Sequence, residues 1–509
     1  MTHTFSTSSQ TENHANQIDL LKKIEERKSQ HQTMCDQKET RYSESGRLSP
    51  SARLDALLDN PSAFLPIGEF CGAHLDEPSH LGGGQFAGIG MVAGKWLMVQ
   101  VYNSAIKGGM MTAIGVKRTL RLQEIAARQR LPFVTLVESA GADLTQQADL
   151  FIDAGTTFAN QARLSAAGIT SIAIVHGTAT AGGAYVAGLA DMTIMVDQYA
   201  QVFLAGPPLV RAATGQDHHA DDLGGSRMHA HVSGLCDFIA KDDQSAIDTA
   251  KQLIQKLPWP QAELPDKKAH HRPDILKLIP KDFRQPIDVS DIIKQLVDRD
   301  QWVEFKPLYG QSTVVGFADI HGHRVGILSN QGPIDRAGSE KSSQFIQLCN
   351  NQNRPLVFLQ NTTGFMVGKQ QEQAGIIKYG ARMIQAVTNV DVPKITIHIG
   401  ASFGAGNYAM CSRSLNPDFV FAWPNNILSV MGGHQAAQVL EMIGGKPEKI
   451  ARIVEQYHQE SSAIYCSGRL WDDGIIDPRD TRWVLCLCLN LIQSRSSIQL
   501  KSTTLGVTR

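Results

Sequence analysis

Two stretches of the chain, LPFVTLVESAG (residues 131–141) and RPLVFLQNTTG (residues 354–364), share one pattern. In each, a proline precedes an apolar run of strand type, and a polar turn ending in glycine follows it. A second pair, IAIVHG (172–177) and ITIHIG (395–400), repeats a strand with its terminal glycine. The step from Pro132 to Pro355 equals the step from Gly177 to Gly400, and this shared offset indicates an internal duplication.

Helical periodicity alternates with these short strands in both copies of the repeat. Residues 116–130 and 157–167 have helical spacing in the first copy, and residues 374–387 have it in the second. Such alternation predicts an α/β fold with a largely parallel sheet in each copy. Upstream, Gly94 and Gly322 pair at a slightly larger offset, so we expect a short length difference in a loop.

The duplication and the polar segments together predict two tandem domains. Residues 1–50 are polar and form an extension, within which residues 17–38 favour a helix. The stretch WPQAELPDKKAHH (259–271) has the composition of a linker. We therefore expect a first domain over 51–265 and a second over 275–509.

The composition restricts the class of function. The 509 residues carry 48 Lys and Arg against 49 Asp and Glu, so a net charge of −1 gives no general attraction to nucleic acid or an anionic membrane. The N-terminus has no signal-peptide pattern and no apolar run is long enough to span a bilayer, so the cytoplasm is the expected location. The eight cysteines are scattered without a CxxC pair, which favours buried free thiols and no metal on this chain.

Two glycine-rich turns follow the repeated strands: GTATAGGAYVAG (177–188) and GASFGAGNYAM (400–410). Each should open a helix, whose first N–H groups are free and positively polarised. Two adjacent donors of this kind can hold an oxyanion. A single turn could equally serve close packing or phosphate binding, although neither carries GxGxxG or a Walker lysine. The duplication favours the oxyanion interpretation, because both copies keep the turn at the same place.

Several runs resemble the carboxyltransferase β subunits of biotin-dependent acyl-CoA carboxylases, closest to the methylcrotonyl-CoA and geranyl-CoA branch. They are TAGGAYV (180–186), FLAGPPLVRAATG (203–215), FLQNTTGFMVG (358–368), GAGNYAMC (404–411) and SVMGG (429–433), and the resemblance extends over residues 53–491. It implies two tandem crotonase-like (ClpP-type) domains. It also implies a hexamer with active sites between neighbouring subunits, acyl-CoA on the first domain and carboxybiotin on the second.

The resemblance assigns roles to individual residues. The backbone N–H groups of Gly182 and Gly183 should face the thioester oxygen, and those of Ala405 and Gly406 the ureido oxygen of biotin. The base would be the biotin nitrogen itself, acting on an acyl-CoA, with the γ carbon as target in a 3-methyl-2-enoyl substrate. Weaker assignments, for which core packing or a plain turn is the rival, are Gly141, Ala142, Ala184 and Phe158 for acyl-CoA and Phe365 and Phe403 for biotin.

The chain has no biotinylation motif and no ATP-grasp stretch, so the resemblance implies a separate α subunit, as in an α6β6 complex. Lys107, Lys117 and Arg118 could meet CoA phosphates, whereas His176 is interpreted as structural. Ser412, Ser414 and His434 depart from the family pattern and leave the acyl group open. The alternatives are a propionyl- or acetyl-CoA-type carboxylase, a Na⁺-linked acyl-CoA decarboxylase subunit, an enoyl-CoA hydratase or isomerase, and a non-catalytic ring scaffold.

Overall fold

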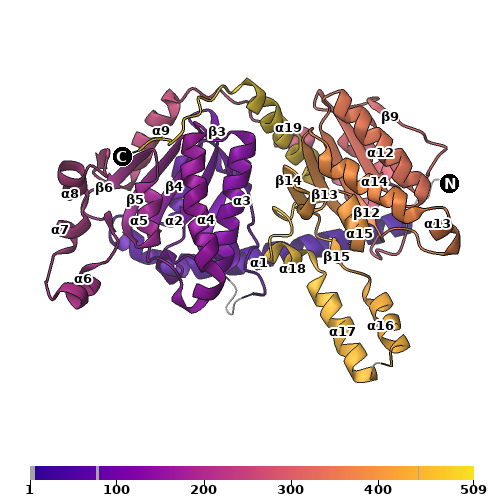
Figure 1. The fold of residues 1–509 in the computed structure, drawn as a ribbon, viewed down its shortest axis with the longest axis horizontal. Helices are drawn as coiled ribbons and strands as arrows, with labels where there is room; N and C mark the ends of the chain where they lie inside the picture. The colour runs from indigo at the N-terminus through magenta and orange to yellow at the C-terminus, as the bar shows by residue number, and fades with distance from the viewer. Residues whose placement is uncertain (1–5, 76–79, 445, 509) are drawn as a thin grey trace. The chain divides into compact units, whose positions relative to one another are not determined.

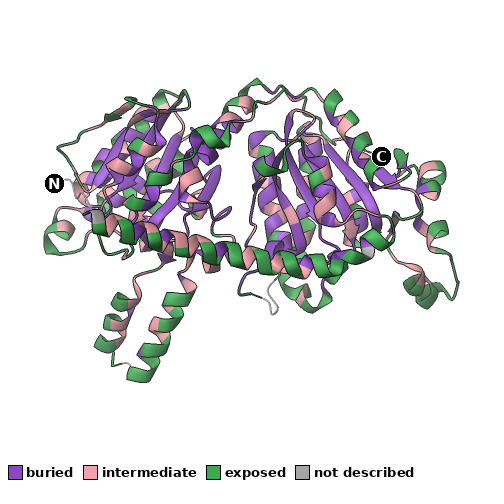
Figure 2. Cartoon of the chain, turned by 180° about the vertical axis from the view of Figure 1, so that it is seen from behind, coloured by how far each residue is buried: buried purple, intermediate pink, exposed green. Residues whose placement is uncertain are grey.

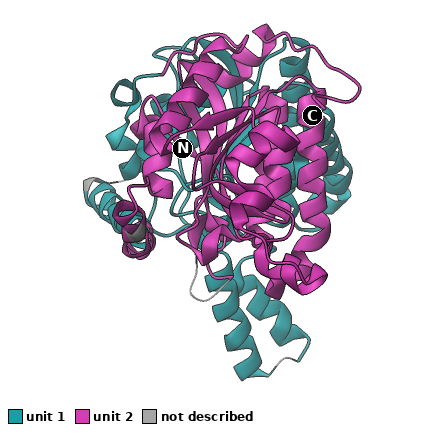
Figure 3. Ribbon diagram, turned by 90° about the vertical axis from the view of Figure 1, so that its left-hand side faces the viewer, with its two compact units in different colours: residues 1–27, 265–467, 471–490 teal, residues 28–264, 468–470, 491–509 magenta. Residues whose placement is uncertain are grey.

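A computed structural model describes residues 6–75, 80–444 and 446–508. The chain divides into two compact units, which Figure 3 colours separately. Unit 2 consists of residues 28–264, 468–470 and 491–509 and holds the first copy of the repeat; unit 1 consists of residues 1–27, 265–467 and 471–490 and holds the second. Helix α1 (Thr7–Glu44) contains the helix predicted over residues 17–38 and is longer at both ends.

The sheet of unit 2 has the order β1-β2-β3-β4-β5-β6-β8, with β7 paired to β5. Strands β3 to β6 pair in parallel, while β1, β2 and β3 pair antiparallel. β-Branched and apolar residues fill β4 and β5, which are buried over nearly their whole length. The bounds are β1 (Leu65–Pro66), β2 (Gln85–Val92), β3 (Lys95–Tyr102), β4 (Phe133–Ser139), β5 (Ser171–Thr180), β6 (Met192–Val196), β7 (Gln201–Phe203) and β8 (Phe238–Ala240).

Helices cover both faces of this sheet (Figure 1). The main core lies where helices α2 and α9 pack on β3 to β6 and bury leucine, isoleucine and alanine side chains. Helices α3 and α4 pack on each other, and α3 begins at Thr112, whose side chain accepts a hydrogen bond from the N–H of Gly115. The bounds are α2 (Pro50–Leu57), α3 (Ala113–Gln129), α4 (Gln147–Ala166), α5 (Gly182–Gly188), α6 (Pro207–Thr214), α7 (Ala220–Gly224), α8 (Ser226–Met228) and α9 (Asp243–Lys256).

The sheet of unit 1 has the order β14-β13-β12-β11-β10-β9, with β15 paired to β13. Strands β11 to β14 pair in parallel, as β3 to β6 do in unit 2. Figure 2 shows the strands of both units as buried and the outer faces of the helices as exposed. The bounds are β9 (Trp302–Glu304), β10 (Thr313–Ile320), β11 (His323–Asn330), β12 (Leu356–Thr362), β13 (Lys394–Phe403), β14 (Phe419–Ala422) and β15 (Ile427–Ser429).

Helices α12 and α14 pack together over this sheet and form its core with β11 and β12. Helices α16 and α17 pack on each other as a hairpin that extends away from the sheet (Figure 1). The bounds are α10 (Lys267–His270), α11 (Val289–Leu296), α12 (Arg336–Asn351), α13 (Lys369–Gln373), α14 (Ile376–Asn389), α15 (Gly404–Ala409), α16 (Gly433–Met442), α17 (Pro447–Glu460), α18 (Ala463–Gly468) and α19 (Thr481–Ser497).

The duplication extends to irregular features of the strands. The pairing of β4 with β5 shifts register between Val137 and Ser139, and that of β12 with β13 shifts between Gln360 and Thr362, the equivalent positions of the second copy. In each unit a short strand then pairs in parallel with the end of the second strand of this pair: β7 pairs with β5, and β15 pairs with β13. The predicted α/β repeat is therefore confirmed, and both shifts occur directly beside the glycine-rich turns.

Two further predictions can be compared with the structure. All eight cysteines are buried thiols outside any disulfide, as the scattered spacing predicted. Among the described residues, no helix is long and apolar enough to cross a membrane.

Candidate functional site

Each glycine-rich turn contains a residue with a positive φ angle at the start of a short helix. In unit 2, Ala181 separates β5 from α5 with φ 51° and ψ −115°. In unit 1, Gly404 occupies the equivalent position of the repeat, with φ 53°. Positive φ is easy for glycine but strained for alanine, and such strain is concentrated at functional sites. The strained residue in the first turn therefore marks it as more than a packing device.

The helix starts present unpaired backbone donors. Within the described part of the chain, no acceptor meets the N–H groups of Gly182, Gly183, Ala405 or Gly406. The next N–H in the first turn is used locally, because that of Ala184 donates to the carbonyl of Ala181 at 3.1 Å. Two adjacent free donors at a helix start form a site for an oxygen that carries negative charge.

The surroundings of the first turn are closely packed. A Cβ atom on Gly182 would lie 2.7 Å from the terminal methyl of Met111 and 3.5 Å from Cζ of Phe158. A Cβ atom on Gly183 would lie 3.0 Å from Cβ of Ser139. A side chain on Gly183 would therefore crowd Ser139, whereas one on Gly182 would displace the flexible end of Met111. Phe158, which the resemblance assigned to the acyl group, lies beside the first turn.

The other residues assigned to acyl-CoA lie in two places, beside the first turn and in the hydrophobic core. Gly141 follows β4 with φ 93°, and its carbonyl accepts a hydrogen bond from the N–H of Met111 at 2.8 Å. Ala142 forms an isolated bridge with Met111, so the 141–142 segment lies next to the first turn. The side chain of Ala184 instead packs in the main hydrophobic core of the unit.

The second turn adjoins a pocket in unit 1. A Cβ atom on Gly406 would lie 2.7 Å from Cα of Gly364, which brings the end of β12 against α15. The pocket lies beside Gly404, with Tyr408, Leu428, Val430 and Trp471 as apolar walls. Its polar lining comes from His398, Ser402, Asn407, Ser412, Arg413 and Ser414.

The two phenylalanines assigned to biotin do not line this pocket. Phe403 is buried and packs edge-on against Phe283, while the ring of Phe365 covers Gly380. The sequence interpretation missed Tyr408 and Trp471. Tyr408 could have been found from the repeat, since it is the equivalent of Tyr185, and both side chains are 49% exposed. Trp471 lies about 40 residues after the rest of the pocket lining, and no repeat position points to it.

Beneath the first turn lies a buried network of charges. The carboxylate of Glu138, near the end of β4, forms ion pairs with the guanidinium groups of Arg53 at 2.7 Å and Arg47 at 3.1 Å. His176, the residue before Gly177, is joined to Asp243 through Nδ1 at 2.6 Å. Burial, together with the charge of Arg53, lowers the pKa of His176 to about 4, so the ring is neutral at pH 7. His176 is fully buried and paired with Asp243 at the start of α9, surroundings that agree with the structural role expected for it.

The charged residues considered for CoA phosphates have different surroundings. Arg118 is 1% exposed and donates to the carbonyls of Ile67, Gly82, Gln85 and Ala87, so its proposed phosphate contact is wrong. A charged residue within a helix normally faces solvent, whereas this side chain holds a loop. Lys107 is partly exposed and pairs with Asp143 at 3.0 Å, close to the 141–142 segment.

One group of potential metal ligands occurs among the described residues, made of His270, His321 and Cys486. The guanidinium of Arg482 donates to Nδ1 of His270 at 3.2 Å. A metal-bound histidine normally donates from its second nitrogen to an acceptor, and here that nitrogen meets a cation. The group therefore gives no support for a metal centre.

His398 provides a pH-dependent prediction at the second turn. It is 1% exposed on β13, its Nδ1 has no hydrogen-bond partner among the described residues, and burial followed by the charge of Arg413 lowers its pKa to about 3. The unfolded ring gains a proton below about pH 6.5 while the folded ring stays neutral, so stability falls as pH falls from 6.5 toward 3. The first copy has Val175 at this place.

We expect His398→Val to stabilise the protein, and to do so more at pH 5 than at pH 7.5. Removing the cost of the neutral buried ring should add about 2 kcal/mol at pH 5 beyond the effect at pH 7.5. Denaturant unfolding at both pH values measures the difference, and replacement of the exposed His434 by valine is the control. An equal effect of His398→Val at both pH values would contradict the assignment.

Comparison with known proteins identifies the family. Residues 41–505 match the carboxyl transferase domain family. A probable biotin-dependent acyl-coenzyme A carboxylase β2 subunit of Mycobacterium tuberculosis is 42% identical over 471 residues, covering 89% of each chain. The mitochondrial methylcrotonoyl-CoA carboxylase β chain of Arabidopsis thaliana is 43% identical, covering 91% of this chain and 83% of its own.

A solved structure gives the same result for the fold. The crystal structure of the Pseudomonas aeruginosa geranyl-CoA carboxylase β subunit matches with a TM-score of 0.92 and 39% identity, covering 100% of this chain and 99% of that one. Its likeness spans both copies of the repeat and their turns. The chain therefore belongs to the carboxyl transferase domain family, among the β subunits of biotin-dependent acyl-CoA carboxylases.

Proposed function

We propose that this chain transfers a carboxyl group from carboxybiotin, carried by a separate α subunit, to the γ carbon of a 3-methyl-2-enoyl-CoA such as methylcrotonyl-CoA or geranyl-CoA. The main supporting observation is the pair of matched turns, each with two free backbone donors at a helix start. A carboxyl transfer between an amide-like donor and a thioester develops negative charge on two oxygens. Two equivalent oxyanion sites meet that requirement, whereas a hydratase would need one such site and a carboxylate base.

The first turn is assigned to the acyl thioester. Gly182 and Gly183 would donate to the thioester oxygen as it gains enolate character, and the conjugated double bond would extend that charge to the γ carbon. Gly182 is partly accessible, and Gly183 is buried beneath it. Met111 and Phe158 would restrict the acyl group beside Gly182. We assign residues 51–265 to this half of the reaction.

The second turn fits a biotin ring by its chemistry. A ureido oxygen needs two N–H donors, and Ala405 and Gly406 offer two without an internal acceptor. The walls formed by Tyr408, Val430 and Trp471 suit the apolar face of a fused ring. Biotin, when bound, supplies the carboxyl group and the nitrogen that accepts the substrate proton. We assign residues 275–509 to this half. Phe365 and Phe403, the residues first assigned to biotin, do not line the pocket.

The proposed partners follow from the family. The similar proteins of Mycobacterium tuberculosis and Arabidopsis thaliana are named as β subunits or chains of carboxylases. We propose a biotin-carrying α subunit as the partner and a hexameric β core. The Na⁺-linked decarboxylase alternative has a relative in the methylmalonyl-CoA decarboxylase subunit α of Veillonella parvula, which is 30% identical. Its lower identity favours the carboxylase direction.

The function can be tested through the second turn alone. Ala405→Pro removes one donor, and proline is tolerated in the first turn of a helix. We expect carboxyl transfer between a carboxylated acyl-CoA and free biotin to fall about 10²-fold, the size of effect that loss of one oxyanion donor has. The control is Ala405→Ser, which keeps the N–H at this exposed position. Full transfer activity in the proline variant would contradict the assignment.

A further inference from the structure

The second copy of the repeat is polar at four positions where the first copy has packed apolar side chains. In unit 2 these positions belong to the main core and are at most 7% exposed: Val137, Val175, Ala179 and Ala184. In unit 1 the same positions of the repeat hold Gln360, His398, Ser402 and Asn407. Buried polar side chains cost stability unless they are paired, so the exchange of a whole core patch for polar residues needs a reason.

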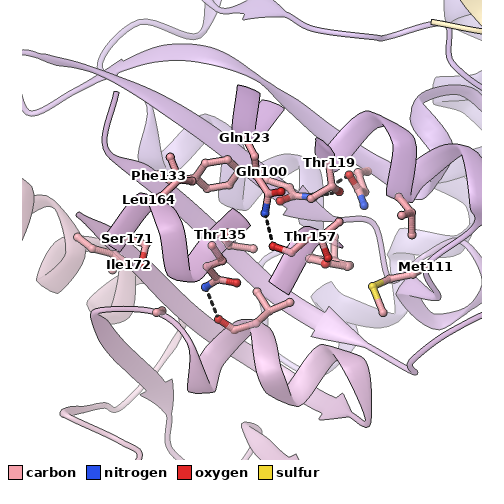
Figure 4. Close-up of a pocket in the computed structure, with 16 residues that line it drawn as sticks. Gln100, Met111, Thr119, Gln123, Phe133, Thr135, Thr157, Leu164, Ser171 and Ile172 are labelled. Carbon is pink, nitrogen blue, oxygen red and sulfur yellow. Dashed lines mark hydrogen bonds between the residues drawn. The ribbon is translucent and has the colours of Figure 1, made fainter. Parts of the chain in front are cut away.

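Three of these four polar residues line the pocket beside Gly404, which has a volume of about 400 Å³. Pockets that bind small molecules are commonly of this size. The cavity in unit 2 between the sheet and helices α3 and α4 is much smaller, with a volume of about 30 Å³ (Figure 4). It has room for one or two waters, and Gln100 and Gln123 form hydrogen bonds of 2.8 Å within it. Of these two cavities, only the pocket beside Gly404 can hold a ligand.

Three of the four polar side chains hydrogen bond with one another. The Oε1 atom of Gln360 accepts from Oγ of Ser402 at 2.7 Å and from Nδ2 of Asn407 at 3.0 Å. The Nε2 atom of Gln360 donates to the carbonyl of Met410 at 2.6 Å. This network joins β12, β13 and α15, so these three side chains hold the elements that frame the pocket.

His398 does not take part in this network. It lines the pocket although it is 1% exposed, and its Nδ1 has no hydrogen-bond partner within the part of the chain that the structure describes. Burial, followed by the charge of Arg413, lowers the pKa of His398 to about 3, so the ring is neutral at pH 7 and one of its nitrogens carries a lone pair. A neutral imidazole with an unused nitrogen beside a pocket is available to bond a ligand.

The lining of the pocket fits a ring with heteroatoms better than a hydrocarbon chain. Its apolar walls are accompanied by His398 and by Ser412 and Ser414, two residues that depart from the family pattern and bond each other at 2.8 Å. An acyl chain would leave the imidazole of His398 without a partner. The ureido ring of biotin keeps one N–H when its other nitrogen carries the carboxyl group, and a neutral imidazole nitrogen can accept from that N–H.

We propose that His398 is a positioning residue for biotin, and that its imidazole accepts a hydrogen bond from the N–H of the ureido ring in the pocket beside Gly404. The ureido oxygen is assigned to Ala405 and Gly406, so this contact holds the ring at a second point and limits its rotation. The inference rests on the proposed function, since it assumes that biotin binds at the second turn. It gives a reason for a destabilising histidine at a position where the first copy has Val175.

The test measures binding and transfer separately in the full-length chain. Ligand-detected NMR gives the dissociation constant of free biotin, and carboxyl transfer from a carboxylated acyl-CoA to free biotin gives its KM. We expect His398→Val to raise both constants about 10-fold, because the ring N–H loses its acceptor. The kcat and the KM for the acyl-CoA should change less than about 3-fold, since the lost contact belongs to biotin binding. His398→Asn keeps a polar group near the place of Nδ1 and should recover part of the affinity.

The matched control is His434→Val, because His434 is exposed on α16 and does not line the pocket. It should leave both constants for biotin unchanged. His398→Ala repeats the test without a branched side chain, should the valine variant fail to fold.

The outcomes separate the inference from the function beneath it. A wild-type chain that neither binds free biotin nor transfers a carboxyl group to it would overturn the proposed role of the second turn. A wild-type chain that does both, together with unchanged constants in the valine or alanine variant, would overturn the role of His398 alone. An asparagine variant that recovers no affinity would show that the shape of the ring matters and not its hydrogen bond, and would also overturn the inference.

Discussion

Replacing Gly182 with valine is expected to lower carboxylation of acyl-CoA by at least about 10²-fold, because it places a branched side chain between the first turn and the thioester. The Cβ atom would approach the methyl of Met111 at 2.7 Å and the ring of Phe158 at 3.5 Å. Met111 can move, so the fold should survive. The thioester oxygen would then lose its approach to the N–H groups of Gly182 and Gly183.

The matched control is Gly188→Ala at the other end of α5. Nothing lies within 4 Å of a Cβ atom there, so the helix keeps its geometry. The two half-reactions should separate in the Gly182 variant. Transfer to acyl-CoA should be lost, while biotin binding at the second turn should persist because it depends on unit 1. Near-normal kcat/KM for acyl-CoA in Gly182→Val would exclude the first turn as the oxyanion site.

The constant offset between the two copies predicted which structural elements correspond. It paired the strands, the turns and the helices after them, and the register shifts beside Ser139 and Thr362 follow the same offset. A duplicated strand and turn can keep the same hydrogen-bond pattern in both copies. The α/β fold could be predicted from the alternation of strands and helices, because helices between successive strands cover the faces of a parallel sheet.

Other features could not be predicted from the sequence. Nothing in the sequence indicated that Ala181 has a positive φ angle. Alanine usually adopts ordinary helix or strand angles, and the strained angle at Ala181 depends on the surrounding turn. Trp471 joins the second pocket from a segment far along the chain, and no local pattern reports such a contact. The prediction for Arg118 was wrong because a charged residue is normally exposed, and only the folded loop around it reveals four backbone acceptors.

Arg118 leads to the second prediction with a large effect, on stability. Its guanidinium donates to the carbonyls of Ile67 at 2.6 Å, Gly82 at 2.8 Å, Gln85 at 2.6 Å and Ala87 at 2.9 Å. Burial lowers the pKa of this guanidinium, because the charge is removed from water. The segment before β2 is glycine-rich and irregular, and Arg118 joins it to β2 and to Ile67; the carbonyl of Ala87 also accepts from the N–H of Ile67 at 3.0 Å.

We expect Arg118→Met to lower the free energy of unfolding by about 3–5 kcal/mol, since the buried carbonyls of Ile67, Gly82 and Gln85 would lose this donor together and that of Ala87 would keep only the N–H of Ile67. Lys117→Met is the control, because Lys117 is the exposed neighbour on the same helix. Denaturant unfolding with a probe in unit 2 measures the effect. Arg118→Lys should recover only part of the loss, because an ammonium group cannot match the fork of a guanidinium. A loss below about 1 kcal/mol in Arg118→Met would mean that water replaces the guanidinium at these carbonyls, and that the loop is held by its glycine turns instead.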